Sequence, residues 1–216
     1  MAPSRHEIII VDDASDDGSA QTIRDIQNTV PDIKTVFHPS NLGIGHALRN
    51  GYSQAENENV CAIPGDGQFD VTELLPFRTV PDPTFVSFYR VENIKYSAFR
   101  NTQSYANRTL NRFAIGVNLK DVNWVKIYKT TELRQLKLHL ESSLVESEIC
   151  AKLILRRNAV IEVRSAYLPR TYGKSKGASM RTVFRAAKET GKLIVEVRKA
   201  ARLARAMNSS RSETGP

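Results

Sequence analysis

Short apolar runs alternate with segments of helical spacing along the first two-thirds of the chain, and this alternation limits the fold more than any other feature. The run EIIIV at 7–11 is continuous and rich in β-branched side chains, as expected for a strand covered on both faces. Further strands are expected at 33–38, 59–63, 84–89, 122–128 and 159–168. Helices are expected between them, around residues 23–30, 47–55, 97–114, 132–140 and 143–155. The pattern predicts an α/β fold with a mostly parallel sheet and helices on both faces.

Positive charge is concentrated near the C-terminus. The formal net charge is +8, yet residues 170–211 alone hold twelve Lys/Arg and two acids, so the rest of the chain is slightly acidic. Residues 179–207 have helical spacing and predict a basic amphipathic extension of the main domain, 6–178. Its apolar stripe either packs on that domain or lies on an anionic membrane, and a merely solvated basic face is the plain alternative. The polar tail 208–216 is expected to be disordered.

The remaining bulk features indicate a chain without a membrane span. No run of about 18 apolar residues is present, and the start MAPSRHEIII has no hydrophobic signal core. We therefore expect a cytoplasmic protein, with peripheral contact at the inner face of the membrane as an extension of that expectation. Cys61 and Cys150 lie in apolar patterns and are expected to be buried free thiols.

Carboxylates follow two of the expected strands. Asp12 and Asp13 end the first strand, and Asp66 follows the third, between Gly65 and Gly67. In open α/β sheets, ligands bind beyond the carboxyl ends of the strands. Carboxylates at that edge can accept hydrogen bonds from a base or ribose, or hold a divalent cation that bridges phosphates. The pattern predicts that Asp66 meets a metal–diphosphate, with a plain turn residue as the alternative.

Five motifs occur in an order and spacing typical of one enzyme family: IIIVDDASDDGS, NLGIGHALRNGY, IPGDGQFD, DVNWVKIYK and PRTYGKSKGAS. Over residues 6–178 the chain resembles family-two glycosyltransferases, in the branch of dolichyl- and polyprenyl-phosphate sugar synthases. The resemblance implies a GT-A fold, a Rossmann-like α/β domain that binds a nucleoside diphosphate sugar with Mg²⁺ or Mn²⁺.

The resemblance also implies a nucleotide side of the site. Asp12 and Asp13 would contact the base and ribose, and the turn bearing Asn41, Gly43 and Gly45 would line the nucleotide.

The metal motif of the family is matched in part. Asp66 corresponds to its second acid and Gln68 to the glutamine that follows, so both are assigned to the metal. Pro64 stands in place of the first acid. The cation would therefore depend on one protein carboxylate plus diphosphate oxygens, which Mg²⁺ tolerates.

Other family elements concern the acceptor and the diphosphate. Arg100 and Ser104, one helical turn apart, would face the acceptor phosphate, although Arg100 is equally well explained as an exposed helix arginine. Glu148, with Glu146 as the second choice, matches an acid of the family that would be either a general base or a loop anchor. The late basic element would approach the diphosphate or lipid phosphate and comprises Arg170, Lys174, Ser175 and Lys176.

The implied activity is inverting transfer of a sugar to a polyprenyl phosphate or a hydroxyl acceptor. Family members begin with a strand and loop, about thirty residues before Glu7, where this chain has only MAPSRH. A misassigned start, a fragment and a degenerate relative all explain this, so a non-catalytic binding protein is the alternative function. The pI of about 9.6 suggests a nucleic-acid binder as a third class. We expect no nucleic-acid partner, because the charge is confined to one end and no matching motif is present.

Overall fold

A computed structural model describes residues 6–30, 32–90, 112, 115–169 and 188–202 of the protein. Its labelled elements are β1 (Ile8–Asp12), α1 (Ser19–Thr29), β2 (Ile33–Phe37), α2 (Ile44–Gln54), β3 (Asn59–Cys61), the 3₁₀ helix η1 (Val71–Phe77), β4 (Thr84–Arg90), β5 (Lys126–Lys129), α4 (Thr130–Arg134), α5 (Val145–Leu155) and β6 (Ala159–Ser165). A further helix spans 188–202 and is called the C-terminal helix below. The alternation of strands and helices confirms the predicted α/β class.

The strands form two sheets rather than one mostly parallel sheet. β1 and β2 pair in parallel, with Ile8 opposite Ile33 and Asp12 opposite Phe37. The larger sheet has the order β3-β5-β4-β6, in which β5 is antiparallel to β3 and β4 while β4 and β6 are parallel. The expectation of a mostly parallel sheet was therefore wrong for β5. A continuous apolar run indicates that a strand is buried, but its direction depends on the connections and on the neighbour it pairs with.

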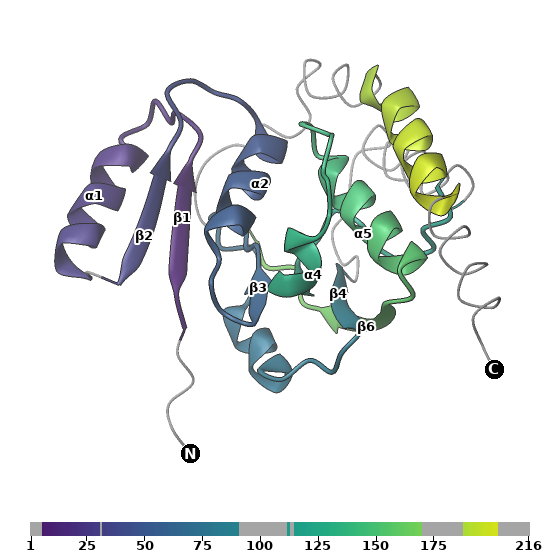
Figure 1. Ribbon diagram of the computed structural model, residues 1–216. Coiled ribbons are helices and arrows are strands. Elements are labelled where there is room, and N and C mark those ends of the chain that lie inside the picture. Colours follow the sequence, from purple (N-terminus) through teal and green to yellow (C-terminus); the bar gives the residue numbers. More distant parts are fainter. Residues whose placement is uncertain (1–5, 31, 91–111, 113–114, 170–187, 203–216) are drawn as a thin grey trace.

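Helix α2 joins the two sheets (Figure 1). On one side, a side chain at Gly51 would bring its Cβ within 3.3 Å of Val11 Cγ2 in β1. On the other side, the ring of Tyr52 packs edge-on against Tyr128 of β5, with ring centroids 5.9 Å apart. Since α2 touches both sheets, it holds the end of β1 in place relative to the larger sheet.

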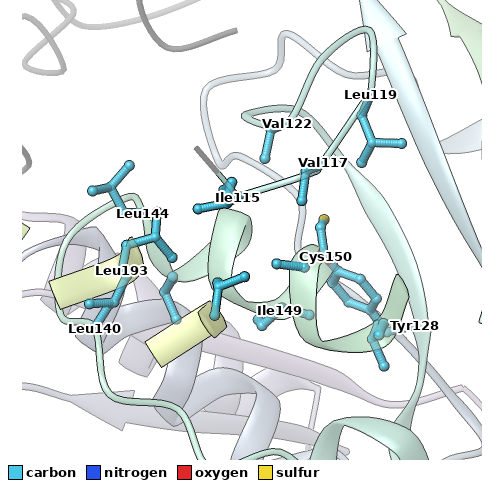
Figure 2. Packing of buried hydrophobic residues seen from close by; sticks show 14 of the residues in the cluster. Ile115, Val117, Leu119, Val122, Tyr128, Leu140, Leu144, Ile149, Cys150 and Leu193 are labelled. Atoms are coloured by element: carbon cyan, nitrogen blue, oxygen red, sulfur yellow. The ribbon is translucent and has the colours of Figure 1, made fainter. Parts of the chain in front are cut away.

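The main core surrounds α5 (Figure 2). Every residue from Val145 to Leu153 is buried, as expected for a helix enclosed on all sides. Leu193 and Val197 of the C-terminal helix belong to the same core, at 0% and 5% exposure. The apolar stripe of this helix, over its described part, thus packs on the domain, which decides between the two uses expected for it.

Both cysteines are free, as expected. Cys150 is fully buried in the main core, and this burial raises the pKa of its thiol to about 11. Cys61 differs from the expectation, because it is only half-buried at the end of β3.

A second, aromatic core supports the segment after β3. The ring of Phe69 packs edge-on against Phe88 of β4 and against Trp124, with centroids 5.4 and 6.0 Å apart. This packing fixes the turn that carries Asp66 and Gln68, since Phe69 follows it directly.

One expected helix is shorter in the structure, and another falls almost entirely on residues that are not described. The segment 132–140 is helical only as far as Arg134, because Leu140 enters the core and the amides of His139 and Leu140 bind the carboxylate of Glu148. The expected helix 97–114 lies almost wholly outside the described residues.

Candidate functional site

The carboxylates that end β1 are held by their surroundings in different ways. Asp12 is 6% exposed and accepts a hydrogen bond from Ser15 N through Oδ2, at 3.2 Å. Asp13 accepts from Leu42 N at 2.8 Å through Oδ1 and from Gly43 N at 2.7 Å through Oδ2. Both oxygens of Asp13 are thus engaged with the turn before α2. This arrangement suits a residue that shapes the turn at 41–43 better than one that contacts a ligand directly.

The same turn carries the three other residues assigned to the nucleotide side. Asn41 Nδ2 donates to the main-chain oxygen of Asp13 at 3.3 Å, which ties the turn to the end of β1. Gly43 has a φ of +96°, a conformation that favours glycine and that points its N–H at Asp13. Gly45 is buried against another segment, where an added Cβ would lie 2.0 Å from the main-chain oxygen of Glu141. Backbone conformation at Gly43 and close packing at Gly45 therefore explain why glycine is present at both positions. Their contact with a nucleotide stays a prediction.

The turn after β3 presents Asp66. Its Oδ1 accepts a hydrogen bond from Gln68 N at 3.2 Å, and Gly67 supplies the positive φ of +72° that the turn requires. Open space surrounds the position of a Cβ at Gly65. Gln68 is 8% exposed and is joined to Leu168 twice: its Nε2 donates to Leu168 O at 3.3 Å, and its O accepts from Leu168 N at 3.0 Å. The half-buried carboxylate of Asp66 is therefore carried on an anchored turn.

This donor set fits a cation that is shared with a diphosphate. Within the described ranges, no group of three or more His, Cys, Asp or Glu side chains could hold a metal ion. Asp66 offers one carboxylate beside exposed glycines, and Mg²⁺ is commonly bound by one or two carboxylates together with substrate phosphates and water. The assigned ligand atom of Gln68 would be its amide oxygen, because its amide nitrogen donates to Leu168.

Glu148 lies deep in the protein on α5. It is 0% exposed, and its oxygens accept from His139 N and Leu140 N at 3.0 Å. Lys152 Nζ lies 2.5 Å from Oε1 of the same carboxylate. These contacts favour the loop-anchoring alternative over a general base, since a base must come within hydrogen-bond reach of the acceptor.

A buried polar network around Glu146 was not found from the sequence. Glu146 accepts from Tyr52 at 2.7 Å and from Tyr128 at 2.6 Å, and Lys126 Nζ lies 3.6 Å from its Oε2. Burial first, and the nearby carboxylate second, hold the pKa of Tyr52 well above its usual value. The network joins α2, β5 and α5. Its members are up to 94 residues apart, so no local pattern could have indicated it.

Comparison with known proteins identifies the family. Residues 2–136 match the family model described as glycosyl transferase family 2. The chain belongs to glycosyl transferase family 2. A curated relative, the undecaprenyl-phosphate 4-deoxy-4-formamido-L-arabinose transferase of Proteus mirabilis, is 26% identical over 182 residues, or 82% of this chain. The chain spans 55% of the length of that relative.

Solved structures of glycosyltransferases share the fold of this family-2 chain. The mannosyltransferase of Pyrobaculum calidifontis, solved with GDP-Man and Mn²⁺, superposes on this chain with a TM-score of 0.52 at 18% identity. The superposition covers 97% of this chain and 67% of the mannosyltransferase chain. The glucosyl-3-phosphoglycerate synthase of Mycobacterium tuberculosis, solved with UDP, gives a TM-score of 0.60 at 16% identity, over 88% and 68% of the two chains. These neighbours show that the α/β fold is the GT-A fold.

The basic elements that the resemblance assigns to the acceptor and diphosphate are outside the described residues: Arg100, Ser104, Arg170, Lys174, Ser175 and Lys176. The same holds for the tail 208–216. Over the part of the chain that is described, no helix combines the length and the apolar character needed to cross a bilayer.

Proposed function

We propose that this family-2 protein is an inverting glycosyltransferase that moves a sugar from a nucleoside diphosphate sugar to a polyprenyl phosphate or a similar acceptor. The observation that carries the proposal is the family match over 2–136, because it includes both carboxylate-bearing strand ends and the turn before α2. The curated relative, a transferase named for undecaprenyl phosphate, supports the choice of acceptor class.

In the proposed mechanism, the residues of this chain mainly position charges. Asp12 and the turn that Asp13 shapes would hold the base and ribose, and Asp66 would hold Mg²⁺ or Mn²⁺ at the diphosphate. The bound cation would offset the negative charge of the leaving diphosphate. The acceptor oxygen attacks the anomeric carbon from the opposite face, the bond from that carbon to the diphosphate breaks, and the nucleoside diphosphate leaves with the electron pair.

A phosphate acceptor agrees with the surroundings of Glu148. A polyprenyl phosphate is already an anion, so the transfer needs no strong general base, and Glu148 can remain buried in its loop contacts. Arg100 and Ser104 would then orient the acceptor phosphate, and the basic element 170–176, with Arg170, would neutralise the diphosphate. A hydroxyl acceptor would need a carboxylate base, for which Glu148 is the sequence-based candidate.

The test of the metal assignment is Asp66→Ala with Asp70→Ala as its control. Asp70 lies four residues further along and accepts from Thr72 N at 2.9 Å as the cap of η1, so its loss costs a helix cap of about 1 kcal/mol but no proposed ligand. We expect wild type and Asp70→Ala to be stabilised by UDP- or GDP-sugars with Mn²⁺, by about 2.7 kcal/mol at 100 times the dissociation constant. Asp66→Ala should lose metal-dependent turnover, and unchanged turnover in this variant would rule out the assignment.

A binding protein without transferase activity is the second candidate. This candidate is favoured by the division into two sheets. Among the described strands, no pairing joins β1, which carries Asp12, to β3, which precedes Asp66. The two carboxylates proposed for the nucleotide and for the metal are therefore carried at the ends of strands in separate sheets. A thermal shift with sugar nucleotide, without turnover on any lipid-phosphate acceptor, would support this candidate.

Peripheral contact with an anionic membrane would use charge rather than the apolar stripe. The face of the C-terminal helix opposite to Leu193 and Val197 exposes a series of cations at 188, 192, 199 and 202. Each cation near an anionic surface contributes about 1 kcal/mol. The protein should therefore pellet with vesicles that contain anionic lipid and stay in solution with neutral ones, and equal pelleting would contradict the proposal.

A further inference from the structure

His38 lies at the centre of the hydrogen bonds that shape the nucleotide-side turn, although neither the motifs nor the family resemblance assigns it a role. It follows β2 directly and is 7% exposed. Its Nδ1 lies 2.7 Å from Asp13 Oδ1, and its Nε2 lies 2.8 Å from Asn50 Nδ2. Its main-chain N also donates to Asp12 O at 2.9 Å. The residue thus connects the end of β1 to the middle of α2.

These contacts determine which ring nitrogen of His38 carries the proton. The carboxylate of Asp13 can only accept, so Nδ1 of His38 carries a proton and donates to Asp13 Oδ1. The amide of Asn50 faces the other ring nitrogen, Nε2. Asp13 and Asn50 therefore hold the ring of His38 from opposite sides.

Asp13 connects His38 to the turn at 41–43. Its carboxylate takes donors from His38, Leu42 and Gly43, and the two main-chain donors belong to the residues just before α2. Without the bond from His38, the carboxylate could rotate away from the position in which both main-chain amides converge on it. The positive φ of Gly43 sets the direction in which the turn enters α2, and the hydrogen bond from Gly43 N to Asp13 fixes the otherwise permissive glycine there.

We propose that His38 is a positioning residue for the donor nucleotide, which acts through Asp13 on the turn at 41–43, and that Asn50 holds its ring in place. This inference rests on the proposed function for the identity of the ligand. His38 itself is buried, so in this proposal it acts from behind Asp13 and not by direct contact with the donor. Loss of its bond to Asp13 should weaken donor binding and leave the rate of the bound complex almost unchanged.

The test compares His38→Asn with His38→Gln. The amide nitrogen of asparagine can take the place of Nδ1 and still donate to Asp13, whereas the longer glutamine reaches toward Asn50 and leaves Asp13 without its donor. With a UDP- or GDP-sugar and Mn²⁺, we expect the glutamine variant to raise the donor KM and Kd roughly tenfold, which is the cost of losing one hydrogen bond to a charged group, with kcat within about twofold. The asparagine variant should stay near wild type, as should His6→Gln, which changes an exposed histidine elsewhere.

A second measurement needs no donor. Long-range ¹H–¹⁵N spectra of the full chain should show a proton on Nδ1 of His38, and Asn50→Ala, which leaves the other side of the ring unsupported, should raise the donor KM even if His38→Gln fails to fold. A wild-type ring protonated at Nε2 alone would overturn the inference, because its Nδ1 could not donate to Asp13. Equal donor affinity in wild type and in the folded glutamine or Asn50→Ala variant would overturn it while leaving the proposed function intact. Failure of wild type to bind any sugar nucleotide would instead refute the proposed function, and with it the role at the donor.

Discussion

Gly45→Ala separates the two explanations for the glycine in the first turn of α2. If Gly45 is present so that a nucleotide can approach, an added methyl group should reduce donor binding and leave stability unchanged. The structure predicts the opposite. The new Cβ would lie 2.0 Å from Glu141 O, 2.2 Å from Glu141 C and 2.6 Å from Ser142 O, and all three are main-chain atoms that cannot rotate away.

The segment at 141–142 cannot move freely, because it is held from its other side. Glu189 of the C-terminal helix accepts from Glu141 N at 3.3 Å and from Ser142 N at 3.0 Å, and Lys192 donates to the neighbouring His139 O at 2.7 Å. Forcing an extra methyl group into a packed site typically costs 1–3 kcal/mol, and this overlap belongs at the upper end of about 3 kcal/mol. Replacing glycine by alanine in a helix returns about 1 kcal/mol, so the net loss in the free energy of unfolding is about 2 kcal/mol.

Urea and thermal unfolding followed by circular dichroism measure this loss. For a chain of this size, about 2 kcal/mol corresponds to a fall in Tm of about 4–8 °C. Gly65→Ala is the matched control, because no heavy atom lies within 4 Å of its Cβ position, and it should stay within about 0.5 kcal/mol of wild type. A Gly45→Ala protein as stable as wild type would refute the packing argument. If such a protein also lost donor affinity, the glycine would be explained by the ligand.

Two further changes test the electrostatics of the fold. Glu146→Ala leaves the buried hydroxyls of Tyr52 and Tyr128 without their acceptor, so it should lower the free energy of unfolding in urea by about 3–5 kcal/mol. Tyr128→Phe removes one hydrogen bond and should lower it by about 1 kcal/mol. Equal losses in the two variants would contradict the network. At Glu7, partial burial tends to raise the pKa, but the amides of Asn57 and Glu56 together with Lys34 outweigh it and hold the pKa of Glu7 below the usual 4.5. The stability that Glu7 contributes is therefore present above pH 4.5 and is lost as the pH falls through the lower folded-state pKa. In urea unfolding measured across acidic pH, Glu7→Gln should make the free energy of unfolding fall less steeply than in wild type. An unchanged slope would disprove this role of Glu7.

The sequence predicted most accurately those helices and strands whose own residues show a clear apolar pattern. β1, β2 and β4 lie within the expected apolar runs or within one residue of them, and α5 agrees with its expected range to within two residues. The placement of Asp12 and Asp66 at or just after the ends of apolar strands could likewise be predicted, because each closely follows a short apolar run in the sequence, whereas the burial of Asp12 at 6% exposure could not. The segment 132–140 was expected to be helical beyond Arg134, because its apolar residues satisfy helical spacing whether they pack as a helix or enter the core as a loop.

The sequence alone determined the fold class, the family and the strand ends at which acids lie, since local composition and the order of motifs are sufficient for these. The tertiary structure decided the antiparallel direction of β5, the packing of Gly45 against 141–142, the burial of Glu148 and the link from Asn50 through His38 to Asp13. Each of these depends on segments brought together from distant parts of the chain. Hydrogen-bond geometry and steric overlap act across a few ångströms in space, so no pattern along the sequence could have indicated them.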